Sequence, residues 1–114
     1  MHDVLRVGVS HVDGMVRVTV HGEVDANSAL ALRAPLDQLD SERRICVDVA
    51  GVHFMDSTGI NVLLTQRMRM LESGGSIHIC NPSADARRIV EITGLCEVFF
   101  EADRCPRQPA VETL

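Results

Sequence analysis

The sequence contains no lysine, no tryptophan and no tyrosine, and apart from its histidines the only aromatic residues are Phe54, Phe99 and Phe100. All eleven cationic side chains are therefore arginine. Without lysine, the chain cannot supply the lysine of a Walker A phosphate loop, a Schiff-base lysine or a lysine general base. With so few aromatic rings, it also lacks the stacking platform on which single-stranded nucleic acid is bound.

The chain carries an excess of acidic residues, with sixteen acidic against eleven basic side chains and a net charge of −5. This balance repels phosphate backbones and anionic lipid surfaces, so we expect no nucleic-acid partner and no membrane partner. No apolar run approaches the roughly 20 residues that span a bilayer, and the opening residues Met1-His2-Asp3 do not resemble a signal peptide. We predict a cytoplasmic protein.

The cysteines lack the spacing of a metal or redox motif. Cys46, Cys80, Cys96 and Cys105 form no C-x-x-C pair, and we predict four free, partly buried thiols. His78 and Cys80 would share one face of a strand, but two ligands fall short of the four that zinc takes. We predict no metal and no other cofactor.

Hydrophobic alternation predicts strands in the first half of the chain. Apolar residues alternate over 5–10 and again over 16–20, which predicts a hairpin with its turn at Asp13-Gly14. Asp25 is the expected N-cap of a leucine-striped helix, and Pro35 inside that stripe predicts a kink or two short pieces. Alternation over 44–49 predicts a third strand.

In the second half of the chain, the spacing of apolar residues changes from that of a strand to that of a helix at Ser57. Apolar residues then recur at helical spacing as far as Gly74-Gly75, and 76–80 again reads as a strand. Asn81-Pro82-Ser83 opens a further helix that ends at Gly94, and 98–100 is predicted to form a short last strand. We place one domain at 1–103, followed by a flexible tail at 104–114.

The predicted element order is β-β-α-β-α-β-α-(β), of the α/β (α+β) class. The strands alternate, whereas a sheet covered on both faces would be continuously apolar. We therefore expect a mixed β-sheet with its helices chiefly on one face.

The segment 51–60 is the most informative for function. It reads Gly51-Val52-His53-Phe54-Met55-Asp56-Ser57-Thr58-Gly59-Ile60, and we interpret it as a loop that runs from the third strand into the second helix. It places two hydroxyl groups at a helix N-terminus, where an anion is favoured by about 0.3–1 kcal/mol. A phosphoryl group on Ser57 would suit this position. The structural alternative is that Asp56 or Ser57 serves only as the N-cap.

Two catalytic interpretations of these residues fail. An aspartic protease needs Asp, then Ser or Thr, then Gly, and Asp56 to Gly59 contains one residue too many. A serine hydrolase elbow needs glycine where Met55 stands. His53 precedes Ser57 by four residues and could be imagined as its base, but a histidine so placed is more often solvated or packed. We predict no enzymatic activity.

Three segments together resemble the STAS domain, and within it the bacterial anti-sigma factor antagonists. They are Gly22-Glu23-Val24-Asp25, then Val47-Asp48-Val49 with Phe54-Met55-Asp56-Ser57-Thr58-Gly59, and Asn81-Pro82-Ser83 leading to Ile92-Thr93-Gly94-Leu95. The resemblance covers roughly Leu5 to Ala102, and it implies the mixed sheet of a STAS-like fold.

The resemblance implies a partner-switching protein that is a substrate and a ligand and has no catalysis of its own. The unphosphorylated form would bind an anti-sigma factor serine kinase and release a sigma factor. The kinase would phosphorylate Ser57, with Thr58 as the second possible acceptor, and a PP2C-type phosphatase would reverse this. Thr58, Pro35 and a shortened last helix depart from the family pattern. We expect a monomer or weak dimer.

We expect partner contacts around the starts of the first two helices, because both should lie at the same end of the sheet. Met55 could be an adaptable apolar contact there, or ordinary core packing. The predicted partner-binding residues are Gly22, Glu23, Asp25, His53, Phe54, Met55, Asp56, Ser57, Thr58 and Gly59. Two other functions within the same fold stay open: a non-phosphorylated STAS subunit of a membrane- or lipid-transport assembly, and a stressosome-type scaffold component.

Overall fold

A computed structural model describes residues 4–100 of the chain. The elements follow the order β1 (Arg6–Val12), β2 (Met15–Val24), α1 (Ala29–Asp37), β3 (Arg44–Met55), α2 (Ser57–Glu72), β4 (Ser76–Cys80), α3 (Ala84–Ile92) and α4 (Cys96–Phe99). The predicted domain boundary at 103, the tail at 104–114 and Cys105 lie outside the described residues.

The strands form one mixed sheet in the order β1-β2-β3-β4. β1 and β2 are the predicted hairpin, antiparallel with Val7 opposite Val20. Asp13 and Gly14 both have positive φ, 52° and 76°, as a two-residue type I′ turn requires. The β2–β3 and β3–β4 pairs are parallel, because α1 and α2 carry the chain back between them. The predicted mixed sheet is confirmed.

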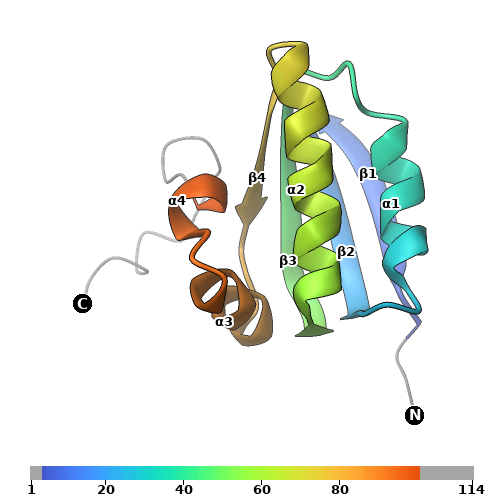
Figure 1. The fold of residues 1–114 in the computed structure, drawn as a ribbon. Helices are drawn as coiled ribbons and strands as arrows, with labels where there is room; N and C mark the ends of the chain where they lie inside the picture. The colour runs from blue at the N-terminus through green and yellow to red at the C-terminus, as the bar shows by residue number, and fades with distance from the viewer. Residues whose placement is uncertain (1–3, 101–114) are drawn as a thin grey trace.

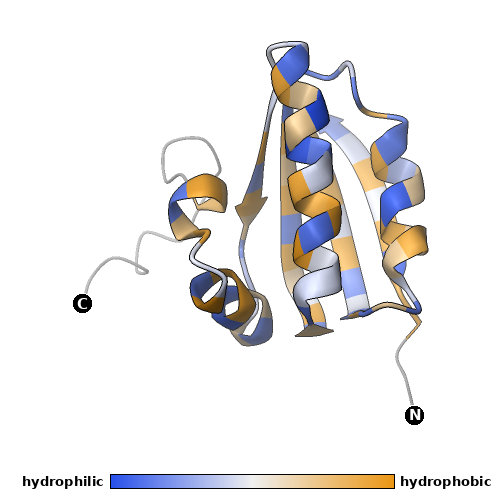
Figure 2. Cartoon of the chain, viewed as in Figure 1, coloured by the Kyte–Doolittle hydropathy of each residue, from blue (hydrophilic) through white to orange (hydrophobic). Residues whose placement is uncertain are grey.

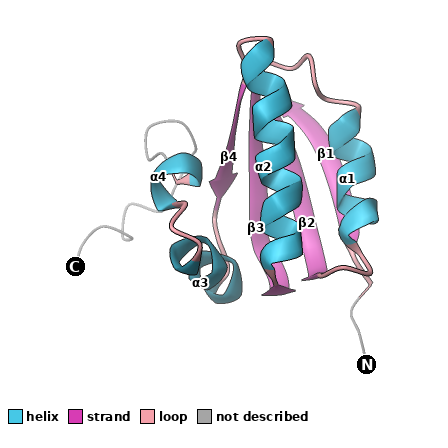
Figure 3. Ribbon diagram, viewed as in Figure 1, coloured by secondary structure: helices cyan, strands magenta, loops and turns pink. Residues whose placement is uncertain are grey.

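Helices α1 and α2 lie side by side on one face of the sheet (Figure 1, Figure 3). Each carries both hydrophilic and hydrophobic residues (Figure 2), as a helix with one buried side should. The core lies between these helices and the inward side chains of the strands. Its fully buried members include Val18, Leu36, Val47 and Leu63.

An ion-pair cluster joins the end of α1 to the last turns of α2. Arg69 donates hydrogen bonds to Asp37 at 2.8 Å and to Asp40 at 2.6 Å, and the buried side chain of Gln66 donates to Asp40 at 2.9 Å. The hydrogen bond from Arg69 lowers the pKa of Asp40 below its ordinary value. The acidic partners likewise raise the pKa of Arg69.

The first helix differs in two ways from its prediction. Pro35 lies inside a single helix, close enough to its end that only one late backbone hydrogen bond is lost. The N-cap is Ser28 rather than Asp25. The side chain of Asp25 instead accepts hydrogen bonds from the backbone N–H groups of Asn27 and Ser28, at 3.0 and 3.1 Å. It thereby forms a turn that precedes the helix.

The predicted strand at 98–100 is wrong. The N–H groups of Val98 and Phe99 both donate to the carbonyl of Leu95 at 3.0 Å, and this closes the short helix α4. The helical turn buries Phe99 completely. A run of three apolar residues is too short to reveal which period it follows.

The prediction of four free thiols is also wrong, because Cys46 and Cys80 form a disulfide. Cys80 lies opposite Asp48 in the β3–β4 register. Cys46 is therefore its diagonal neighbour on the same face, with 6.0 Å between the two Cα atoms, within the range that a disulfide spans. Cys96 is free. This pairing depends on a strand register that the spacing of the cysteines does not reveal.

Candidate functional site

The site lies at the junction between β3 and α2. The predicted loop over 51–55 is instead the second half of β3. It is a strand because β2 runs alongside it, with Val24 opposite Met55 and a register shift after Gly22. The segment that presents Ser57 is therefore held by sheet hydrogen bonds.

Asp56 is the N-cap of α2, as one of the two capping alternatives predicted. Its carboxylate accepts the N–H of Thr58 at 2.9 Å and its carbonyl accepts the N–H of Gly59 at 3.1 Å. Ser57 is thus the first helical residue and has no capping role. Its side chain is exposed, and within residues 4–100 its hydroxyl forms no hydrogen bond.

The residues beneath Ser57 are tightly packed. Met55 and Ile60 are both about 1% exposed. A Cβ atom on Gly59 would lie 2.7 Å from Cγ1 of Val24 and 3.1 Å from Cγ of Met55. The first turn of α2 can approach the sheet this closely only because residue 59 is glycine. The hydroxyl is consequently presented on a rigid support.

The end of β2 completes the site. Glu23 lies opposite Phe54 in the sheet, and the N–H of Asp56 donates to the carbonyl of Val24 at 3.2 Å. These contacts place Asp25 and Asp56 just after the ends of the neighbouring strands β2 and β3, as expected for two helices that start at the same end of the sheet.

Sequence reasoning missed Ser28 in this site. Its hydroxyl donates to the carbonyl of Glu23 at 2.7 Å and also accepts the N–H of Asp25 at 3.0 Å. Ser28 therefore fixes the turn that leads out of β2. The spacing of Asp25 and Ser28, three residues apart with Asn27 between them, is a signal for such a turn.

The predicted partner-binding residues fall into three groups by exposure. Buried members are Gly22, Met55 and Gly59; partly buried members are Glu23, Asp25, Asp56 and Thr58; exposed members are His53, Phe54 and Ser57. The buried residues shape the site from below, so the packing interpretation of Met55 is the one that the structure supports. The surface open to a partner centres on the exposed group.

Gly22 has a specific structural role. Its φ is +112°, and a Cβ atom there would lie 2.7 Å from the carbonyl oxygen of Val4. Only glycine adopts this backbone conformation readily and leaves room for the nearby backbone of Val4. Gly22 therefore shapes the end of the strand.

Acidic side chains surround Ser57. The carboxylates of Glu23, Asp25 and Asp56 give this end an acidic character, but in the described part of the chain no three His, Cys, Asp or Glu side chains are grouped so that they could hold a metal ion. The site offers one exposed hydroxyl, one exposed aromatic ring and an acidic rim. Such an arrangement is suited to binding and modification.

None of the helices within residues 4–100 is both long and apolar enough to cross a membrane.

A family model described as "Mlab, STAS domain" matches residues 7–100. The chain belongs to the STAS-domain family. The anti-sigma-B factor antagonist of Bacillus subtilis is 33% identical to this STAS domain over 98 residues, which cover 83% of this chain and 88% of that protein.

Solved structures agree with this assignment. An anti-sigma factor antagonist from Mycobacterium paratuberculosis has a TM-score of 0.73 and 27% identity, covering 87% of this chain and 88% of that one. The anti-sigma factor antagonist SpoIIAA in its unphosphorylated form has a TM-score of 0.74 over 85% of this chain and 88% of its own, at 22% identity, which supports the fold alone.

Proposed function

We propose that this STAS domain acts as an anti-sigma factor antagonist whose binding is switched at Ser57. With Ser57 unmodified, the domain binds an anti-sigma factor serine kinase and so frees a sigma factor. Phosphorylation of Ser57 by that kinase ends the complex, and a PP2C-type phosphatase restores it. The domain is a substrate and a ligand in this scheme, it has no catalysis of its own, and it works in the cytoplasm.

The observation that carries the proposal is the exposure of the Ser57 hydroxyl at the first position of a 16-residue helix. A kinase can reach this hydroxyl without unfolding the domain. The cap bonds are made by Asp56, so modification of Ser57 breaks no hydrogen bond of the helix start. Backbone N–H groups and the helix dipole accommodate the added negative charge in the free protein.

The same charge opposes partner binding. A phosphoryl group adds about −1.5 to −2 charges at neutral pH. Asp56 and Asp25 follow the ends of neighbouring strands. A partner that covers the site would therefore bury their negative charges together with that of the phosphoryl group. An unpaired buried ion costs several kcal/mol. A penalty of about 4 kcal/mol weakens binding roughly a thousandfold.

The test compares the wild type, the phosphoprotein and two variants, Ser57→Ala and Ser57→Asp. Incubation with the kinase and ATP should add the mass of one phosphoryl group to the wild type and none to Ser57→Ala. Kinase affinity, measured by calorimetry, should be retained in Ser57→Ala and lost in the phosphoprotein and in Ser57→Asp. Thermal stability should change little in all of them.

Matched controls identify the acceptor. Thr58→Val removes the second hydroxyl, and Ser10→Ala removes an exposed serine on β1. Both should still be phosphorylated. Phosphate mapped to Thr58 would reassign the acceptor, and a phosphoprotein that binds the kinase as tightly as the wild type would refute the switch.

Two outcomes would favour the other functions of this fold. A chain that binds its partner but never gains phosphate would act as a non-phosphorylated subunit of a transport assembly. A large symmetric assembly in size-exclusion chromatography would indicate a stressosome-type scaffold, whereas our proposal expects a monomer or weak dimer.

A further inference from the structure

Strand β4 forms one edge of the sheet. It is the last strand in the sheet order, and within residues 4–100 it pairs only with β3. The N–H of Ser76 donates to the carbonyl of Arg43 at 2.9 Å, toward the β3 side. Backbone groups alternate in direction along a strand, so the N–H and C=O of Ile77 point to the open edge. An extended chain could hydrogen-bond there.

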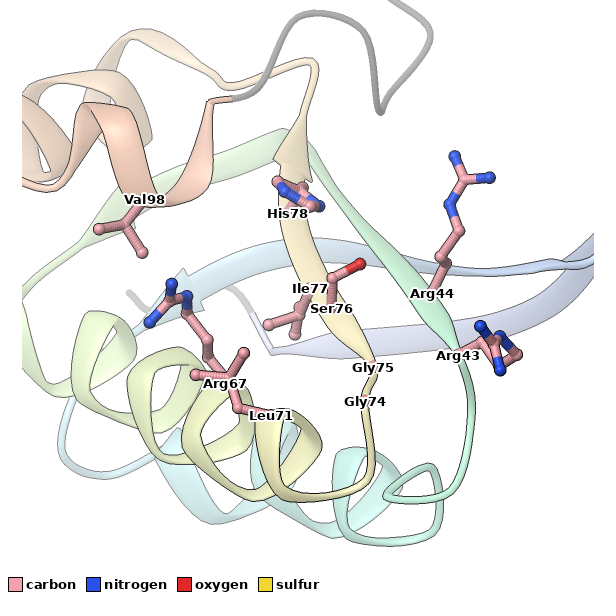
Figure 4. Close-up of a pocket in the computed structure, with 10 residues that line it drawn as sticks. All are labelled: Arg43, Arg44, Arg67, Leu71, Gly74, Gly75, Ser76, Ile77, His78 and Val98. Atoms are coloured by element: carbon pink, nitrogen blue, oxygen red, sulfur yellow. The ribbon is translucent and has the colours of Figure 1, made fainter.

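A cavity of about 370 Å³ lies along this edge. Arg67 and Leu71 of α2 and Val98 of α4 line it on the helix side (Figure 4). The side chains of Arg44 and His78 border it across the strand. The edge of β4 is therefore flanked by side chains on both faces, as a groove for an added strand would be.

The lining is basic although the chain as a whole is acidic. The lining residues include three arginines and no acidic residue, in a chain of net charge −5. Within the described residues, the guanidinium groups of Arg43 and Arg67 have no carboxylate partner. This groove therefore favours a negatively charged occupant.

The arginines are spread along the groove. Figure 4 shows the guanidinium of Arg67 on the helix side of β4 and that of Arg44 beyond the opposite side of the strand, with Arg43 at the end of the groove. An extended chain could reach both Arg67 and Arg43, because its side chains alternate between two faces.

We propose that the β4 edge binds an extended acidic segment of a partner protein by strand addition. Main-chain hydrogen bonds to Ile77 hold the segment, and acidic side chains along it meet Arg67 and Arg43. A second copy of this chain does not fit, since pairing two β4 edges would bring the arginines together. The groove lies at the opposite end of α2 from Ser57 and is independent of the Ser57 switch.

The test uses the full chain, labelled with 15N, and a synthetic peptide of alternating glutamate and valine. Titration should shift the amide signals of Gly75, Ile77 and Leu71 and slow hydrogen exchange at Ile77. The double variant Arg43→Ala/Arg67→Ala should bind about tenfold more weakly. The matched control Arg6→Ala/Arg33→Ala, which removes the same charge from β1 and α1, should bind as the wild type does.

Further probes separate strand addition from simple charge attraction. The same peptide with alternate amides N-methylated should lose binding, and a lysine–valine peptide should not bind. Any of four results would overturn the proposal: no shift at millimolar peptide, equal binding of the N-methylated peptide, equal shifts with inorganic triphosphate or oligothymidylate, or an Ile77 amide already protected before peptide is added.

Discussion

The two ends of α2 are held in different ways. At its start, Met55, Gly59 and Val24 are packed so closely that a single added methyl group has no room. At its other end, about 24 Å away for a helix of 16 residues, Arg69 ties the helix to Asp37 and Asp40 through half-exposed ion pairs. Packing alone fixes the first end, whereas the second combines packing of the fully buried Met70 with these ion pairs.

The switch that we propose at Ser57 requires this difference, because it needs a surface hydroxyl on a support that stays unchanged. Ser57 projects from the packed end, so its modification alters surface charge above a support that does not yield. The other end carries ion pairs on its surface, and the strength of these pairs depends on salt and pH. The following substitutions measure each side of this comparison.

The largest effect is expected from Met55→Ala at the packed end. Truncating a fully buried methionine leaves a cavity and should reduce the free energy of unfolding by about 2–5 kcal/mol. Phe54→Ala is the matched control, because Phe54 is 39% exposed and contributes less to the core. Urea denaturation measures both. Equal losses of unfolding free energy in the two variants would show that the packing beneath Ser57 is not rigid.

Gly59→Ala should be the next most damaging substitution. Its Cβ would lie 2.7 Å from Val24, and overpacking of this kind costs about 1–3 kcal/mol. Gly8→Ala is the control, because a Cβ at Gly8 meets nothing within 4 Å. A Gly59→Ala protein as stable as the wild type would mean that the helix start can move away from the sheet.

Asp56→Ala removes the N-cap of α2 and should cost about 1 kcal/mol. Ser83→Ala removes the corresponding cap of α3, where the serine hydroxyl accepts the N–H of Ala86 at 3.1 Å, and should cost a similar amount. Thermal unfolding compares the two. A much larger loss at Asp56 would indicate that it supports more than the helix start.

Arg69→Met should have the smallest effect of these substitutions, because ion pairs that are open to solvent contribute little to the free energy of unfolding. The contribution also depends on pH. Arg69 lowers the pKa of Asp40, so the stabilisation is fully present above the unfolded-state value of about 3.9 and is lost as the pH falls through the lower folded-state value.

Unfolding the wild type and Arg69→Met between neutral and strongly acidic pH should therefore show two curves that converge at low pH. High salt should also bring them together. Arg33→Met, a substitution of another exposed arginine, serves as the control. If Arg69→Met cost as much as Met55→Ala at neutral pH, the contrast between the two ends of α2 would fail.

Much of this architecture could be predicted where periodicity was long or a turn was explicit. The Asp13-Gly14 turn fixed the hairpin, and the apolar spacing from Ser57 fixed α2. The misses fell where a local pattern was short or ambiguous. The apolar residues of 98–100 form a helix, and the segment after Gly51 is a strand because β2 pairs with it.

The candidate site shows the same division. Chain order alone was enough to place Asp25 and Asp56 at one end of the sheet, since parallel strands joined by helices all point the same way. It could not show that Met55 and Gly22 are buried while Phe54 is exposed. That depends on the register shift between β2 and β3, which decides the face on which each side chain lies.

Sequence alone was enough for the order of strands and helices as far as α3, the acidic excess, the lack of lysine and the capped helix start with its hydroxyl, because each of these is a local or compositional property. The tertiary structure decided which side chains are exposed around Ser57, that Cys46 meets Cys80, and that arginines distant in sequence line one groove. These depend on strand register and on how helices pack, and neither property is encoded in any one segment.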